Sequence, residues 1–230
     1  MSEQKVHSAL NNNDDSVVKL KNFWTKYSKT VTLVAALVIV IGGGWVAYQQ
    51  FYQQPKEAAA LEAMFRAEDY FRKDSANLAL NGDGQSLGFL KVIEKYSGTK
   101  AANLAKFYAG SCYIKINENA KAIELLKDFS TSSDIIQARA YKLLGDAYAE
   151  SGKNEDALSS YKKAGHYFEK DEVNSPEYLF FAAYFASEVM KNNTEATDLY
   201  KEIKKKYPRS QQAYDADKYL AKMGVYNSEN

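Results

Sequence analysis

Cysteine and histidine are the side chains that most often supply nucleophiles, general bases and metal ligands, and this chain of 230 residues holds few of them. Its one cysteine is Cys112, and its two histidines are His7 and His166. An internal disulfide and a cysteine-based metal site are therefore excluded, and a catalytic triad could use only one histidine outside the N-terminal tail. Gly82-Asp83-Gly84 lacks the lysine and the spacing of a phosphate-binding loop. We expect no catalytic residue, no metal and no cofactor.

Charge also limits the classes of function. The chain has 30 Lys and Arg against 29 Asp and Glu, a formal net charge of +1. A nucleic-acid binder would need a basic excess, so we expect no nucleic acid as a partner. Apolar residues make up 46% of the chain and only three residues are proline, which favours long helices around a real core.

The side chains left to carry a function are those of a predicted binding groove. They are mostly apolar or cationic and recur on the first helix of each predicted helical hairpin: Leu104, Phe107, Ile114, Arg139, Lys142, Tyr178, Phe181 and Phe185. An exposed apolar groove is typical of a site for a peptide or a partner helix. The alternative is that a neighbouring helix or an insert buries these rings. The Lys and Asn pattern that clamps an acidic C-terminal peptide is absent.

A repeat in the sequence predicts the hairpins that position this groove. Eight positions follow the offsets of a tetratricopeptide hairpin: Tyr141, Leu144, Gly145, Tyr148, Gly152, Ala157, Tyr161 and Ala164. The small Gly145 and Ala157 would let the two helices approach closely, and Tyr148 and Tyr161 would fill the space on either side.

Other copies of the pattern extend the prediction to residues 56–223. One copy lies 35 residues upstream, a weaker one begins at Lys56 with a long loop after Lys73, and a drifted one spans 180–208. The amphipathic stretch 210–222 would cap the stack. The sequence thus predicts an all-α fold, with an α-solenoid of about four helical hairpins plus a capping helix, followed by a tail at 224–230.

An apolar run before the repeats predicts a membrane anchor over 23–52. No charged residue occurs from Thr30 to Gln54, and Trp24 and Trp45 bracket the run at about 31 Å of helix. The apolar run is closely preceded by Lys19, Lys21, Lys26 and Lys29, and only Lys56 follows it closely. The positive-inside rule therefore places residues 1–22 in the cytoplasm, as a disordered tail, and the solenoid outside it. The alternative is a cleaved signal peptide with its site at Gly42 to Gly44.

Small residues in the span indicate a second contact surface. Gly42, Gly43, Gly44 and Ala47 would let another membrane helix approach closely. Membrane lipid is expected around residues 23–52. The alternative is a tolerated flexible stretch in the outer leaflet.

The combination of a basic tail, one span and a solenoid ending in Tyr207-Pro208-Arg209-Ser210 and an Ala-rich cap resembles the YfgM family. The resemblance covers residues 19–230. It implies a non-enzymatic ancillary subunit of the Sec translocon in the bacterial inner membrane, with its C-terminal domain in the periplasm. It also implies SecYEG and a membrane-anchored periplasmic chaperone such as PpiD as partners, and an emerging polypeptide as a further ligand. No catalytic residue is carried over.

Two other functions remain open from the sequence. One is a tetratricopeptide scaffold for envelope assembly or cell division with no link to the translocon. The other is an enzyme, against which the small number of Cys and His residues argues.

Overall fold

A computed structural model describes the backbone of residues 3–225 and the side chains of residues 17–225. The structure is 80% helical, and its described residues form no strand. Contacts divide the chain into two compact units, residues 1–55 and residues 56–230. The predicted all-α class, with an apolar N-terminal helix followed by helical hairpins and a cap, is confirmed. Residues 226–230 of the predicted tail lie outside the described residues.

The first unit is helical throughout its described part. Helix α1 spans Glu3–Tyr48, and its apolar side chains from Val31 to Val46 are exposed. The helix from Val17 to Arg72 is long and apolar enough to cross a membrane. The structure differs from the predicted disordered tail at 1–22, because helix begins at Glu3. No glycine or proline occurs before Gly42, so nothing in the backbone stops the helix once the apolar segment has formed it.

Helical structure also continues across Pro55, which lies between the predicted anchor and the predicted solenoid. Proline has no backbone N–H and cannot make a normal helical hydrogen bond. The turn before it is the π-helix η1 (Gln49–Gln53), in which the Gln54 N–H donates to the Gln49 carbonyl. This wider turn accommodates the backbone hydrogen bond that Pro55 cannot make, and α2 (Gln54–Arg72) follows directly.

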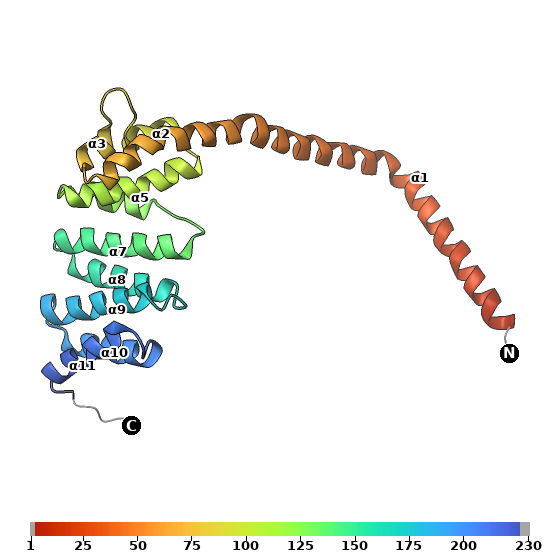
Figure 1. Cartoon of the computed structure of the whole chain (residues 1–230). Helices are drawn as coiled ribbons and strands as arrows, with labels where there is room; N and C mark the ends of the chain where they lie inside the picture. Colours follow the sequence, from red (N-terminus) through yellow and green to blue (C-terminus); the bar gives the residue numbers. More distant parts are fainter. Residues whose placement is uncertain (1–2, 226–230) are drawn as a thin grey trace. The chain divides into compact units, whose positions relative to one another are not determined.

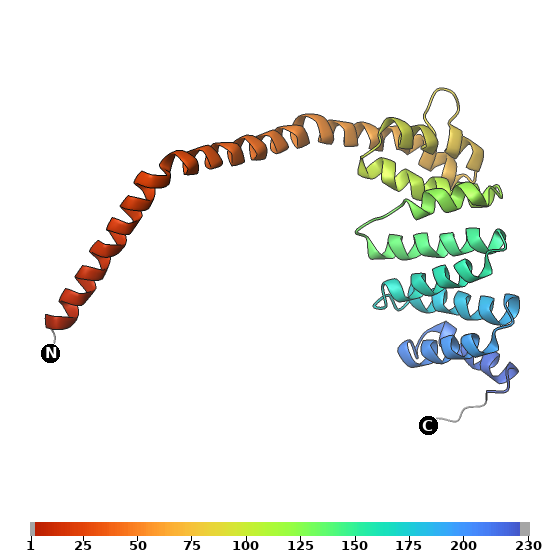
Figure 2. The ribbon, with the colours of Figure 1, turned by 180° about the vertical axis from the view of Figure 1, so that it is seen from behind.

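The second unit is a stack of helical hairpins (Figures 1 and 2). In each hairpin a first helix, called the A helix here, packs on a second, the B helix. In chain order the pairs are α2 with α3 (Ala76–Asn81) and α4 (Phe89–Lys95), α5 (Lys100–Lys115) with α6 (Asn119–Lys127), α7 (Asp134–Glu150) with α8 (Asn154–Tyr167), and α9 (Asn174–Tyr184) with α10 (Asn193–Lys206). The π-helix η2 (Phe185–Val189) extends α9, and α11 (Gln211–Lys222) packs on α9 and α10 as the cap.

Glycines set the distance between A and B helices as the repeat pattern predicts. A Cβ atom on Gly145 of α7 would lie 2.6 Å from two ring carbons of Tyr161 of α8. A Cβ on Gly110 of α5 would lie 2.7 Å from Cγ of Leu126 of α6. Only glycine fits at either position without a shift of its neighbour.

The first hairpin departs from the standard repeat. The short helix α3 occupies part of the segment predicted as a long loop after Lys73. Beyond it, Asp83 accepts hydrogen bonds from the backbone N–H groups of Ser86 (2.6 Å) and Gln85 (2.9 Å) and from the Tyr70 hydroxyl (2.8 Å). These donors, the Ser86 amide foremost, hold the pKa of Asp83 below its ordinary value. The carboxylate therefore orders the loop between α3 and α4.

The hydrophobic core is segmented rather than continuous. One cluster joins the first hairpin to α5, a second joins α5 and α6 to α7, and a third joins α8 to the last hairpin and the cap. Tyr108 and Tyr113 pack against both of the first two clusters, and Tyr148 packs against the second and third. Each segment thus contacts mainly its neighbours, as stacked repeats do.

Candidate functional site

The A helices enclose an apolar pocket of about 280 Å³, called the A-helix pocket below. It lies between α5 and α7, with one side chain from α2. Its lining is largely aliphatic and aromatic: Phe71, Leu104, Phe107, Tyr108, Ser111, Ile135, Ile136, Arg139 and Leu143. Ile135 is 53% exposed, so the pocket opens to solvent beside it.

Tyr108 forms a fixed wall of this pocket. Its ring stacks on Phe89 with centroids 5.3 Å apart and meets Phe71 edge-on at 5.2 Å. The preceding residue, Phe107, packs against Phe129 with ring centroids 5.5 Å apart. Aromatic side chains held on several sides keep one orientation. The wall is therefore formed before any partner arrives.

Arg139 supplies the positive charge at the rim. Its side chain is exposed, and no carboxylate among the described residues pairs with it. The pKa of Tyr108 is raised first by burial and then by the charge of Glu68, while Arg139 and Arg72 act in the opposite sense. Arg139 and the Tyr108 hydroxyl thus add polar groups to an otherwise largely apolar lining.

Lys142, one turn beyond the rim, is already engaged inside the molecule. Its ammonium lies 2.9 Å from a carboxylate oxygen of Asp146 and 4.7 Å from the centre of the Phe181 ring. The Tyr161 hydroxyl donates to the other oxygen of Asp146 at 3.0 Å. Lys142 and Asp146 thus tie α7 to α8 and α9, and the ammonium is not free to receive an anion.

The structure brings three of the predicted groove residues together in the A-helix pocket, namely Leu104, Phe107 and Arg139. Phe107 is 7% exposed and contributes to the floor rather than to an open surface. Ile114 is half-buried and packs against the cluster between α5 and α7. Phe181 is 38% exposed and stacks on Tyr161.

Two predicted groove residues belong instead to the core. Tyr178 is 6% exposed and packs against Ala138 and Ala164, and Phe185 is 8% exposed and meets the Tyr161 ring edge-on. The two residues lie seven apart on one face of the helix, and that face is directed at the preceding hairpin. The prediction that they line an open groove is wrong, because the hairpin of α7 and α8 covers this face of the helix.

Part of the pocket lies outside the residues predicted from the sequence. Tyr108 and Ile135 were not among the predicted residues, nor was Phe71 of α2. Ile135, Arg139 and Leu143 follow a four-residue spacing on α7, which is the helical signal that would have extended the predicted face from Arg139. Phe71 gave no such signal, since its place depends on how the first hairpin packs.

The small residues of the anchor lie on the exposed surface of α1. Gly42, Gly43, Gly44 and Ala47 are exposed on α1, and a Cβ on any of the three glycines would meet nothing within 4 Å. Their role in helix contact stays a prediction.

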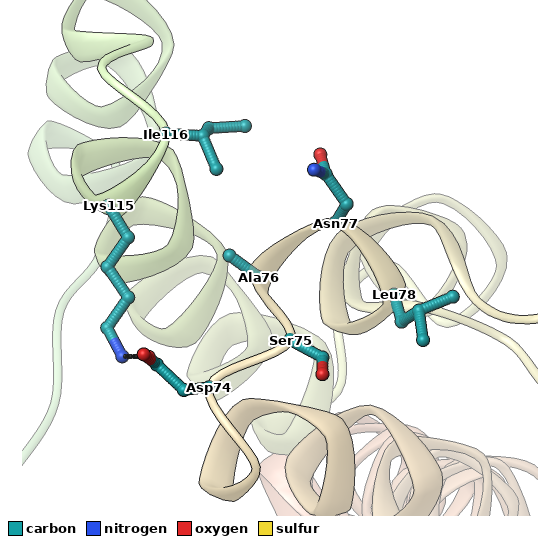
Figure 3. Close-up of a pocket in the computed structure, with 7 residues that line it drawn as sticks. All are labelled: Asp74, Ser75, Ala76, Asn77, Leu78, Lys115 and Ile116. Atoms are coloured by element: carbon teal, nitrogen blue, oxygen red, sulfur yellow. Dashed lines mark hydrogen bonds and ion pairs between the residues drawn. The ribbon is translucent and has the colours of Figure 1, made fainter.

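A larger pocket of about 620 Å³ lies between the first hairpin and the end of α5 (Figure 3). It is lined by Asp74 and Ser75 before α3, by the first turn of α3 from Ala76 to Leu78, and by Lys115 and Ile116 at the end of α5. Lys115 forms an ion pair with Asp74 across it. Its charges are thus neutralised within the chain, and the ion pair joins the first hairpin to the second.

The residues with potential chemistry are also engaged. His166 Nε2 lies 2.8 Å from Glu202, and with Glu169 these side chains could surround a metal ion. The ammonium of Lys206 already lies 2.6 Å from Glu169 and 2.9 Å from Glu202, so it occupies the position of a cation. Burial raises the pKa of the Cys112 thiol to about 11, which leaves it protonated at neutral pH.

Comparison with known families gives one match. The profile of a family described as tetratricopeptide repeat-like domain matches residues 21–135, which is half of the chain. The match runs from before the apolar span to the first turn of α7, and it includes most of the residues around the A-helix pocket. Neither curated proteins nor solved structures give a match.

Proposed function

Because the chain belongs to the tetratricopeptide repeat-like family, whose stacked hairpins form surfaces for protein contact, we propose that it is a non-enzymatic, membrane-anchored adaptor. The A-helix pocket carries this proposal. It is apolar, open beside Ile135 and walled by a preformed aromatic cluster. Sites of this kind hold the anchoring side chain of a partner polypeptide.

The proposed place of action is the extracytoplasmic side of the Sec translocon. The resemblance to the YfgM family supports SecYEG and a PpiD-like periplasmic chaperone as partners. The excess of lysines before the apolar span supports a cytoplasmic N-terminus in the bacterial inner membrane and a periplasmic solenoid. Anchoring would raise the effective concentration of the solenoid near the channel exit, so that modest affinity is sufficient.

Site-specific photocross-linking in native membranes tests the proposal. A benzophenone amino acid at Ile135 reports on the mouth of the pocket, and the same group at Glu124, exposed on α6, is the control. We expect channel subunits, the chaperone or an emerging polypeptide among the products from Ile135 and not among those from Glu124. Phe185 is unsuitable for such a test because its replacement would disturb the core.

Two results would change the proposal. Equal products at both positions, or none at Ile135, would remove the pocket as the binding site. Products made of envelope-assembly or division proteins would keep the pocket and replace the translocon with the scaffold function.

A further inference from the structure

We propose that the A-helix pocket selects a partner segment in which a large apolar side chain is followed closely by an aspartate or glutamate. The proposal rests on the proposed function and adds the chemistry of the ligand. The apolar side chain would fill the pocket, and the carboxylate would pair with Arg139 at its rim.

The size of the pocket indicates a single side chain. Pockets that enclose drug-sized ligands run from about 300 to 1,000 Å³, and this one, at about 280 Å³, lies just below that range. Leu104, Phe107 and Leu143 offer only carbon atoms, and polar groups in the lining are limited to those of Tyr108, Ser111 and Arg139. A polar side chain would therefore exchange its water for a mostly apolar surface. The Tyr108 ring is already fixed by Phe89 and Phe71, so binding requires no ordering of that wall.

The charge at the rim indicates the neighbouring group. Three lysines of α5 and α7 already have partners: Lys106 pairs with Asp128, Lys115 with Asp74 and Lys142 with Asp146. Arg139 pairs with no carboxylate among the described residues, and its side chain is exposed. A guanidinium group presents donors in a fork that matches a carboxylate.

The surrounding charges favour one side of the pocket. Arg72 lies near Tyr108 but already pairs with Asp69 at 3.6 Å, and Glu68 adds a carboxylate on α2. Glu68 would repel an acidic group placed over α2. The partner's carboxylate is therefore expected over α7, where Arg139 lies unpaired. Burial of the adjacent apolar side chain would exclude water and so strengthen the ion pair between Arg139 and this carboxylate.

Peptide binding to the full chain in phosphatidylcholine nanodiscs tests the inference. The probes are fluorescein-labelled Gly-Ser nonapeptides, blocked at both ends, with a central Leu followed by Asp, Asn or Lys. We expect fluorescence anisotropy to show the Asp peptide binding about tenfold more tightly than the Asn peptide. Arg139→Gln should abolish this preference, and Arg139→Glu should transfer it to the Lys peptide. Since Arg139 is exposed, both variants should fold, which circular dichroism checks.

Two further measurements separate this inference from the proposed function. Ile135→Ser should weaken all Leu-containing peptides alike, and a peptide with Ala in place of Leu should not bind. One result would overturn the inference and leave the pocket as a binding site: Ile135→Ser weakens binding, but the Asp, Asn and Lys peptides bind with equal affinity. An Asp preference that persists in Arg139→Gln would overturn it as well. The Ile135 cross-links judge the adaptor function independently, because they do not depend on charge.

Discussion

Replacing Gly145 by alanine would place a methyl group at the tightest contact between α7 and α8. The new Cβ would lie 2.6 Å from two ring carbons of Tyr161, where ordinary contacts are 3.4 Å or longer. The ring cannot easily give way, because its hydroxyl donates to Asp146 at 3.0 Å and Phe185 packs against it at 5.6 Å. The helices themselves would have to separate.

The expected cost follows from two opposing effects. Overpacking a filled core costs about 1–3 kcal/mol, and the rigid contact places Gly145→Ala near the upper end. The higher helix propensity of alanine over glycine raises the free energy of unfolding by about 1 kcal/mol. The net loss in the free energy of unfolding is about 2 kcal/mol, or about 4–8 °C in Tm for a unit of this size.

Thermal unfolding of the full chain in micelles measures this loss. Near-UV circular dichroism of the tyrosines is the suitable signal, because both tryptophans, Trp24 and Trp45, lie in α1. Gly110→Ala is the matched comparison, since its Cβ would meet Leu126, which can change rotamer more readily than a held ring. It should lower Tm by less. A Tm of Gly145→Ala equal to or above that of the parent chain would refute the proposed clash. So would a result in which adding Tyr161→Leu to Gly145→Ala does not offset part of the loss in Tm.

Three further predictions concern other sites. Thr99→Ala should cost about 1 kcal/mol in chemical denaturation, because the Thr99 hydroxyl caps α5 by accepting from the Ala102 N–H at 3.0 Å; a loss below a few tenths would contradict the cap. Asp83→Asn should destabilise the chain at pH 6 and destabilise it progressively less as the pH is lowered into the acid range, since a carboxyl whose pKa is lowered on folding stabilises above its unfolded pKa and loses this effect as the pH falls through the folded pKa; a difference constant with pH would contradict it. Cys112 should react with a thiol reagent at pH 8 only after unfolding, and fast stoichiometric labelling of the native chain would disprove its burial.

The repeat architecture was predictable because it depends on local rules. A tetratricopeptide hairpin needs small residues at fixed offsets and large ones beside them, and Gly145 and Tyr161 satisfy this within one hairpin. Helix continuity around Pro55 was harder to predict, since a π-helical turn compensates for the proline without a mark in the sequence. The short helix α3 also escaped prediction, because its packing on α5 rather than its own pattern stabilises it.

The candidate site was only partly predictable because it depends on contacts between hairpins. Spacing shows which residues of an A helix share a face, but it does not show which face the adjacent hairpin covers. Tyr178 and Phe185 were assigned to the groove on spacing and lie in the core. Tyr108 was missed because its wall is completed by Phe71 and Phe89, which come from two other helices.

The segmented core has a mechanical consequence. Tension between the anchor and a partner held in the A-helix pocket would run through the first two hairpins and α7, across the contacts of Tyr108 and Tyr113. The last hairpin and the cap lie beyond this path and would carry no load. Since each cluster packs mainly against its neighbours, the loaded hairpins should unfold one after another rather than in a single cooperative step. The solenoid would therefore extend gradually under the tension that a bound partner, such as a moving polypeptide, exerts on it.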